Sequence, residues 1–201
     1  MLQCRFPAGR RWLALNSLIT LLCPWLAPAQ VVINEIHYDP IGGSTNEFVE
    51  LFNAGTNTVA LDNWRFLDGI TYLFPSPTPL PAGAYLVVAS DRNAFAARYP
   101  SVTNLAPGAF SGQLSNQGER LALADAATAV VYEVTFDNNA PWPAAAAGLG
   151  SSLVLLNPLA SPTDPANWGA SAEVHGSPGG PGALFVHDLV INEVLAHTDP
   201  P

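Results

Sequence analysis

Residues 46–55 have the sequence NEFVELFNAG, and residues 61–66 have the sequence LDNWRF. Together they predict two β-strands around a Gly/Asn turn, with Trp64 placed to fill a core. Side chains two residues apart share one face of a strand. The strand expected at 47–53 therefore has two mixed faces, with Phe48, Glu50 and Phe52 on one and Glu47, Val49, Leu51 and Asn53 on the other. Since neither face is wholly apolar, we expect a second sheet to cover only one of them.

The rest of the chain indicates more strands. Runs rich in β-branched or alternating apolar residues lie between turn signals, at residues 31–38, 64–66, 70–74, 84–89, 120–124, 130–136 and 151–156. Asp68-Gly69 predicts a hairpin turn. Four prolines between 75 and 81 predict an extended surface loop. Asp91 is expected to cap a short helix over 92–99, which Pro100 ends.

Several segments, in their order along the chain, resemble the lamin tail domain over residues 31–179. They are INEI, EFVELFNAG, LDNWRFLDG, LPAGAYLVVASD, LSNQGERLALAD, APWP and GSSLVLLNP. The resemblance implies an all-β, immunoglobulin-like sandwich of two antiparallel sheets, and the strand pattern agrees with that class. It also implies a non-catalytic interaction or structural module, of a type that is appended to larger secreted proteins in bacteria. The filament role of animal lamins is not implied, because the chain has no heptad region.

The first 29 residues have the pattern of a secretory signal peptide. Arginines at 5, 10 and 11 precede an apolar stretch, Trp12 to Leu26, and Ala27-Pro28-Ala29 offers a small-x-small cleavage site. We expect cleavage after Ala29 and a secreted or cell-surface protein. A membrane anchor is the alternative, but the apolar run is short and is interrupted by Asn16 and Pro24.

Removal of this segment changes both the cysteine content and the charge. Cys4 and Cys23 both lie within it, so the mature domain must be stable without disulfides. The remaining chain has four arginines, no lysine and sixteen acidic residues, which gives it a net charge of −12. Nucleic-acid surfaces need clustered cations. We therefore expect no nucleic-acid partner and, after cleavage, no membrane insertion.

The C-terminal part predicts a linker and the start of a repeat. Gly/Pro-rich residues 176–182 indicate a flexible linker. Residues 190–194, VINEV, match residues 32–36, VINEI. We assign the sandwich domain to residues 30–179, a linker to 180–188 and the start of a second, truncated repeat to 189–201. The chain would then be the front of a longer tandem protein, or a truncated product.

Motifs for catalysis are missing from the sequence. Gly148-Leu149-Gly150-Ser151-Ser152 differs from the nucleophile elbow and predicts a turn that enters a strand. P-loop and dinucleotide-binding glycine patterns are absent. The mature chain has no cysteine or lysine nucleophile. We predict that it is not an enzyme. The alternative is an accessory domain of a secreted hydrolase whose catalytic part lies beyond residue 201.

Candidate metal ligands are oxygen groups rather than nitrogen or sulfur. None of the four histidines has a histidine four residues away, so zinc is not expected, and His37 is interpreted as a surface residue of a strand. Asp39, Glu47 and Asp137 are candidates for calcium, which would make the module a calcium-stabilised adhesion repeat. The alternative is that these acids are solvated or form turns. No other cofactor is expected.

Aromatic side chains are the remaining candidates for ligand binding. Trp142 and Trp168 could stack on a sugar if exposed, but the alternative is that they anchor loops against the sandwich. Partners are expected among other domains of the same protein, extracellular proteins or glycans.

Overall fold

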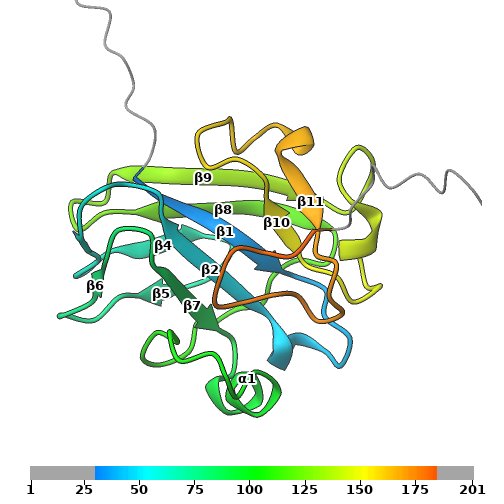
Figure 1. Ribbon diagram of the computed structural model, residues 1–201, viewed down its shortest axis with the longest axis horizontal. Coiled ribbons are helices and arrows are strands. Elements are labelled where there is room, and N and C mark those ends of the chain that lie inside the picture. Colours follow the sequence, from blue (N-terminus) through cyan, green and yellow to red (C-terminus); the bar gives the residue numbers. More distant parts are fainter. Residues whose placement is uncertain (1–29, 185–201) are drawn as a thin grey trace, which may run out of the picture.

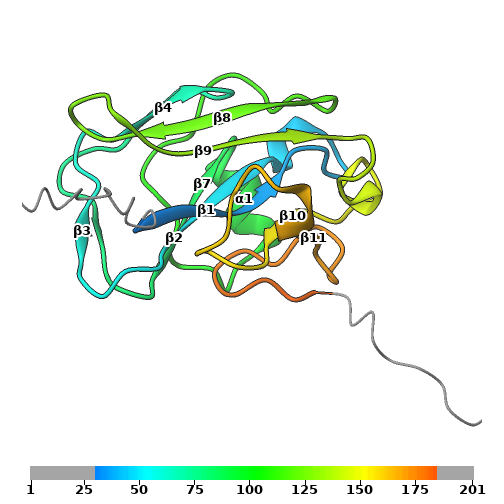
Figure 2. The ribbon, with the colours of Figure 1, turned by 90° about the horizontal axis from the view of Figure 1, so that it is seen from above.

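A computed structural model describes residues 30–184, which form two antiparallel sheets stacked face to face (Figures 1 and 2). The larger sheet has the strand order β11-β10-β1-β2-β7, and the smaller one has the order β5-β4-β8-β9. This arrangement confirms the antiparallel all-β class that the sequence predicted and is consistent with an immunoglobulin-like sandwich.

The strand bounds follow the turn chemistry of the sequence. The larger sheet contains β1 (Val31–His37), β2 (Phe48–Asn53), β7 (Tyr85–Ala89), β10 (Leu153–Leu155) and β11 (Trp168–Ala170). The smaller sheet contains β4 (Arg65–Asp68), β5 (Tyr72–Leu73), β8 (Gly118–Ala124) and β9 (Val130–Asp137). A short pair, β3 (Val59–Ala60) and β6 (Pro79–Leu80), stands apart. Helical turns are α1 (Arg92–Arg98) and the 3-10 segments Ser44–Asn46, Ala144–Ala146 and Pro165–Asn167.

The main core lies between the two sheets. Val49 and Leu51 on β2 and Leu121, Val134 and Phe136 on β8 and β9 are all buried in it. Burial of such side chains stabilises the fold by roughly 1.5–3 kcal/mol each. Along β9 these buried residues alternate with exposed ones, which explains why the sequence located this strand well, whereas β2 is buried on both faces.

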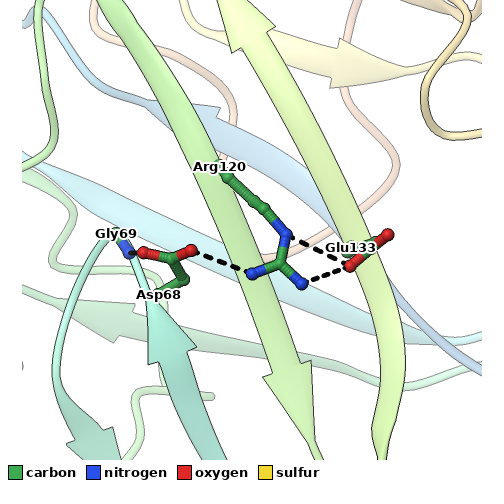
Figure 3. A network of polar contacts seen from close by, with 4 residues as sticks. All are labelled: Asp68, Gly69, Arg120 and Glu133. Atoms are coloured by element: carbon green, nitrogen blue, oxygen red, sulfur yellow. Dashed lines mark hydrogen bonds and ion pairs between the residues drawn. The ribbon is translucent and has the colours of Figure 1, made fainter.

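The expected hairpin at Asp68-Gly69 is present, since β4 and β5 pair on either side of it. Figure 3 shows what lies beside it on the smaller sheet. Arg120 Nη1 is 2.9 Å from Asp68 Oδ2, and Arg120 Nη2 is 2.5 Å from Glu133 Oε2, while Gly69 N donates to Asp68 Oδ1. All three charged side chains are about half exposed, so solvent and salt weaken these ion pairs.

The smaller sheet covers only one face of β2, as predicted. The outer face of the larger sheet is covered as well, by a different part of the chain. A second apolar cluster buries the other face beneath α1, where Phe48 meets Phe95 edge to face with ring centroids 5.7 Å apart. Asp91 caps α1 as expected, because its Oδ1 accepts from Asn93 N at 2.8 Å and Ala94 N at 3.0 Å.

Several regions depart from the sequence-based predictions or lie outside the structure. β11, which pairs with β10, was not predicted. The stretch 75–81 was expected to be a surface loop, but it contains β6, which pairs with β3 and buries Leu80. The expected signal peptide (1–29) and second repeat (189–201) lie outside the described residues. Within residues 30–184, α1 has seven residues, and no helix has the length and hydropathy needed to cross a membrane.

Candidate functional site

The polar groups with the most unusual surroundings lie on the outer face of the larger sheet, beside α1. Glu35 and His37 of β1 and Glu50 of β2 each have a relative exposure of 0%. The interpretation of His37 as a surface residue was wrong: its ring packs against Phe48, with ring centroids 5.4 Å apart. Glu35, Glu47 and Glu50 are likewise buried rather than solvated.

The cover over Glu35 and Glu50 comes from residues 173–183, which we call the C-terminal strap. Ser177 N donates to Glu35 Oε1 at 2.7 Å, and Gly179 N donates to Glu50 Oε2 at 2.5 Å. Two further residues complete the set. Ser152 Oγ, just before β10, donates to Glu35 Oε1, and Asn34 Nδ2 of β1 donates to Glu50 Oε1 at 2.9 Å. The strap is therefore fastened to the sheet through two carboxyl groups.

Glycine allows the strap to approach the sheet closely. A Cβ at Gly182 would lie 2.5 Å from Val154 Cγ1, and one at Gly176 would lie 2.6 Å from Glu35 Oε1. Gly176 also has a φ of +85°, which other residues rarely adopt. The composition that predicted a flexible linker at 176–182 thus serves a different purpose here. It lets bare backbone lie on the sheet and turn its N–H groups toward buried acids.

Burial controls the protonation of this cluster. Desolvation raises the pKa of Glu35 from 4.5 to about 7 and that of Glu50 from 4.5 to about 8, although their hydrogen bonds act in the opposite direction. Desolvation lowers the pKa of His37 to about 4, so its ring is neutral at physiological pH. Glu35 Oε2 and both ring nitrogens of His37 have no hydrogen-bond partner among residues 30–184.

A groove of about 490 Å³ runs between the strap and the end of α1, lined by Arg98, Tyr99 and Val102 and by the strap itself. Tyr99 Oη donates to His175 O at 2.5 Å and ties the helix end to the strap. The carboxyl groups lie behind the strap rather than in the groove. Chemically, this arrangement can accept hydrogen bonds and exchange protons, but it does not present a nucleophile to a substrate.

The three acids predicted as calcium candidates are each hydrogen-bonded to a different part of the chain. Asp39 Oδ1 accepts from Asn116 Nδ2 at 2.7 Å, and Glu47 Oε2 accepts from Leu114 N at 2.9 Å. Asp137 Oδ1 accepts from the backbone N and Nδ2 of Asn139, both at 2.8 Å. In the part of the chain that the structure describes, no three histidine, cysteine or acidic residues form a group that could hold a metal ion. Calcium binding stays a prediction.

The two tryptophans predicted as ligand candidates lie together in the core. Trp142 is 7% exposed and Trp168 is 3% exposed, and their ring centroids are 6.1 Å apart. Trp168 Nε1 donates to Pro162 O at 2.8 Å. The geometry matches the alternative of loop anchors. A sugar-stacking role stays a prediction that this burial does not favour.

Sequence reasoning missed the carboxyl cluster, although one signal for it was present. Glu50 lies between Phe48 and Phe52 on one face of the strand expected at 47–53, and an acid flanked by aromatic residues on one face indicates a buried partner. The partners themselves, Ser152, Ser177 and Gly179, have no motif that would identify them.

Comparison with known families adds one match. A family model described as Lamin Tail Domain matches residues 26–138, more than half of the chain. The match spans β1 to β9 and includes Glu35 and Glu50, but it ends before β10, β11 and the strap. The resemblance noted from the sequence extended further, to residue 179. No curated protein matches the chain.

Proposed function

The chain belongs to the lamin tail domain family, and we propose that it acts as an interaction or spacing module of a multidomain protein that is secreted or displayed on the cell surface. The lamin tail domain is a non-catalytic domain. The finer assignment rests on the position of the chain ends, on the burial of the reactive groups and on the surface that remains exposed.

The position of the two ends of the described chain carries the proposal. β1 begins at one end of the sandwich, and the chain leaves beyond β11 at the other end, as both views show (Figures 1 and 2). The end at β1 would be free after cleavage at Ala29, so neighbouring domains would follow only from the far end, beyond β11. This geometry supports a module that stands at the N-terminal end of a longer chain and projects away from the domains that follow it.

The chemistry of the buried cluster supports a non-catalytic reading. Ser152 Oγ donates to Glu35, but both groups are buried and the strap lies over them. A catalytic serine must be reached by its substrate and hydrogen-bonded to a general base. Here Ser152 is hydrogen-bonded to Glu35, but both are buried beneath the strap, so a substrate would not reach them.

An exposed apolar patch supports contact with another protein. Ile41 is 48% exposed and Val174 is 61% exposed, and both lie against Gly150. Leu149, next to Gly150 in the chain, is 69% exposed. Large contiguous apolar patches on a protein surface are typical of sites that contact other proteins. Other domains of the same protein, extracellular proteins and glycans are the proposed partners.

Export and processing give the decisive test. The full coding sequence, tagged after its last codon, is expressed in its own host, and the medium, surface and cytoplasm are separated. We expect mature protein starting at Gln30 in the medium or on the surface. The matched control, Ala29→Arg, removes the small residue before the cleavage site and should leave the N-terminus uncut. Cytoplasmic protein that retains its first residues would overturn the assignment.

Sequencing beyond codon 201 tests the modular part of the proposal. Further lamin-tail copies or an anchoring domain would support a spacing module. A catalytic domain there would instead favour the accessory-domain alternative, and hydrolysis of ester, glycoside or phosphate substrates by the purified chain itself would contradict the non-catalytic assignment.

A further inference from the structure

We propose that the C-terminal strap is a pH-sensitive latch, closed over the larger sheet while Glu35 and Glu50 are protonated and released when both carboxyl groups ionise. The inference goes beyond the modular role and does not depend on secretion or on neighbouring domains. It rests on the burial and pairing of the two acids and on the lack of a compensating cation, which outweigh the bonds from the strap amides, since those bonds by themselves favour the ionised form.

Glu35 and Glu50 are direct cross-strand partners in the register of β1 and β2. Side chains opposite one another in an antiparallel pair lie about 5 Å apart at Cβ, and like charges placed there destabilise the pair. Beyond them in the same row, Glu35 pairs with Val154 and Glu50 pairs with Val87. The two acids therefore repel each other when ionised, and apolar neighbours flank them.

The strap bonds to both members of the pair, through Ser177 N and Gly179 N. Its other ties lie toward its ends, where His175 N donates to Gly150 O at 2.6 Å and Ala172 N donates to Ala183 O at 2.8 Å. The middle of the strap, residues 176–180, can thus lift while both ends stay attached. Water that enters beneath it would solvate both carboxylates.

Charged and titratable groups from every neighbouring element face this cluster. They are His37 on β1, Tyr85 on β7, Arg98 and Tyr99 at the end of α1, and Glu173 and His175 on the strap. Glu173 adds to the negative charge, and the buried His37 is neutral. Arg98 donates from Nε to Asn46 Oδ1 at 3.2 Å, and within residues 30–184 it forms no ion pair with either acid. Ionisation of both acids is therefore not neutralised.

The direction of the pH dependence follows from the pKa values. In an open strap the acids would titrate near 4.5, whereas in the closed strap the pKa values are about 7 for Glu35 and about 8 for Glu50. Closing the strap therefore takes up protons at pH values between about 4.5 and about 8. The free energy that favours closure is fully present below about pH 4.5 and is lost as the pH rises through 7 and 8.

Hydrogen exchange of the strap amides, followed by mass spectrometry on the full chain, tests the latch. We expect peptides covering residues 173–183 to lose at least about tenfold in protection between pH 5 and pH 8, beyond the change in an unstructured peptide of the same sequence. Peptides from β8 and β9 should keep their protection over the same pH range. The variant with Glu35→Gln and Glu50→Gln should show no such excess change.

Glu47→Gln is the matched control. Burial also raises the pKa of Glu47 to about 7, but this acid accepts from Leu114 N and does not touch the strap. The control should keep the pH response of the natural chain. The latch is refuted if strap protection in the natural chain is independent of pH, if β8 and β9 open in parallel, or if the folded double-Gln variant responds like the natural chain. If that variant does not fold, the pH dependence of strap protection in the natural chain, compared with that of β8 and β9, decides whether the latch exists.

Discussion

Replacement of Asn53 by alanine should be among the most destabilising single changes in this domain that leave the core volume nearly intact. Asn53 ends β2 with 0% exposure, and its side chain makes three bonds to the backbone. Its Nδ2 donates to Asn57 O and to Leu80 O, each at 2.8 Å, and its Oδ1 accepts from Gly55 N at 3.0 Å. One amide thus joins β2, the turn that follows it and β6.

The size of the effect follows from those bonds. Each contributes about 1 kcal/mol net, and a buried partner left unsatisfied adds to the loss, so Asn53→Ala should lower the free energy of unfolding by roughly 3 kcal/mol. That is a large part of the roughly 5–15 kcal/mol available to a domain. Asn53→Asp keeps the acceptor for Gly55 N but replaces both donors with an acceptor, and it should be at least as destabilising.

Urea unfolding followed by tryptophan fluorescence measures the change, with an unaltered slope showing that the unfolded state is the same. Asn57→Ala is the matched control, because that side chain is exposed and only its backbone oxygen is used. It should stay within about 0.5 kcal/mol of the natural chain. If Asn53→Ala were equally mild, the three-way bonding would not hold the turn, and the reasoning would be refuted.

Three other changes test separate parts of the structure. Phe95→Ala should cost about 3–5 kcal/mol in urea unfolding, since this 2% exposed ring fixes α1 to the sheet, and a loss under about 1 kcal/mol would show that α1 is not anchored there. Arg120→Ala should lower the unfolding midpoint only slightly at low salt and not at high salt, because its pairs with Asp68 and Glu133 are exposed, and an equal loss at high salt would contradict this. Millimolar calcium should leave the melting temperature unchanged if Asp39, Glu47 and Asp137 keep their separate partners, whereas a rise would support the calcium-stabilised alternative.

The sequence by itself determined the features that depend on residues close together in the chain. Alternation located β9, Asp68-Gly69 located a hairpin, and Asp91 located the start of α1, because strand faces, tight turns and helix caps are set within a few residues. The order of such segments was also enough to indicate the family.

Only the tertiary structure decided what covers the outer face of the larger sheet. Glu35 meets Ser177 across 142 positions of the chain, and Glu50 meets Gly179 across 129. An acidic residue in a strand has the same local pattern whether water or a distant backbone lies over it. A Gly/Pro segment likewise has the same composition whether it is a free linker or a strap. Burial, and with it the raised pKa of both acids, depends on which distant segments the fold brings together.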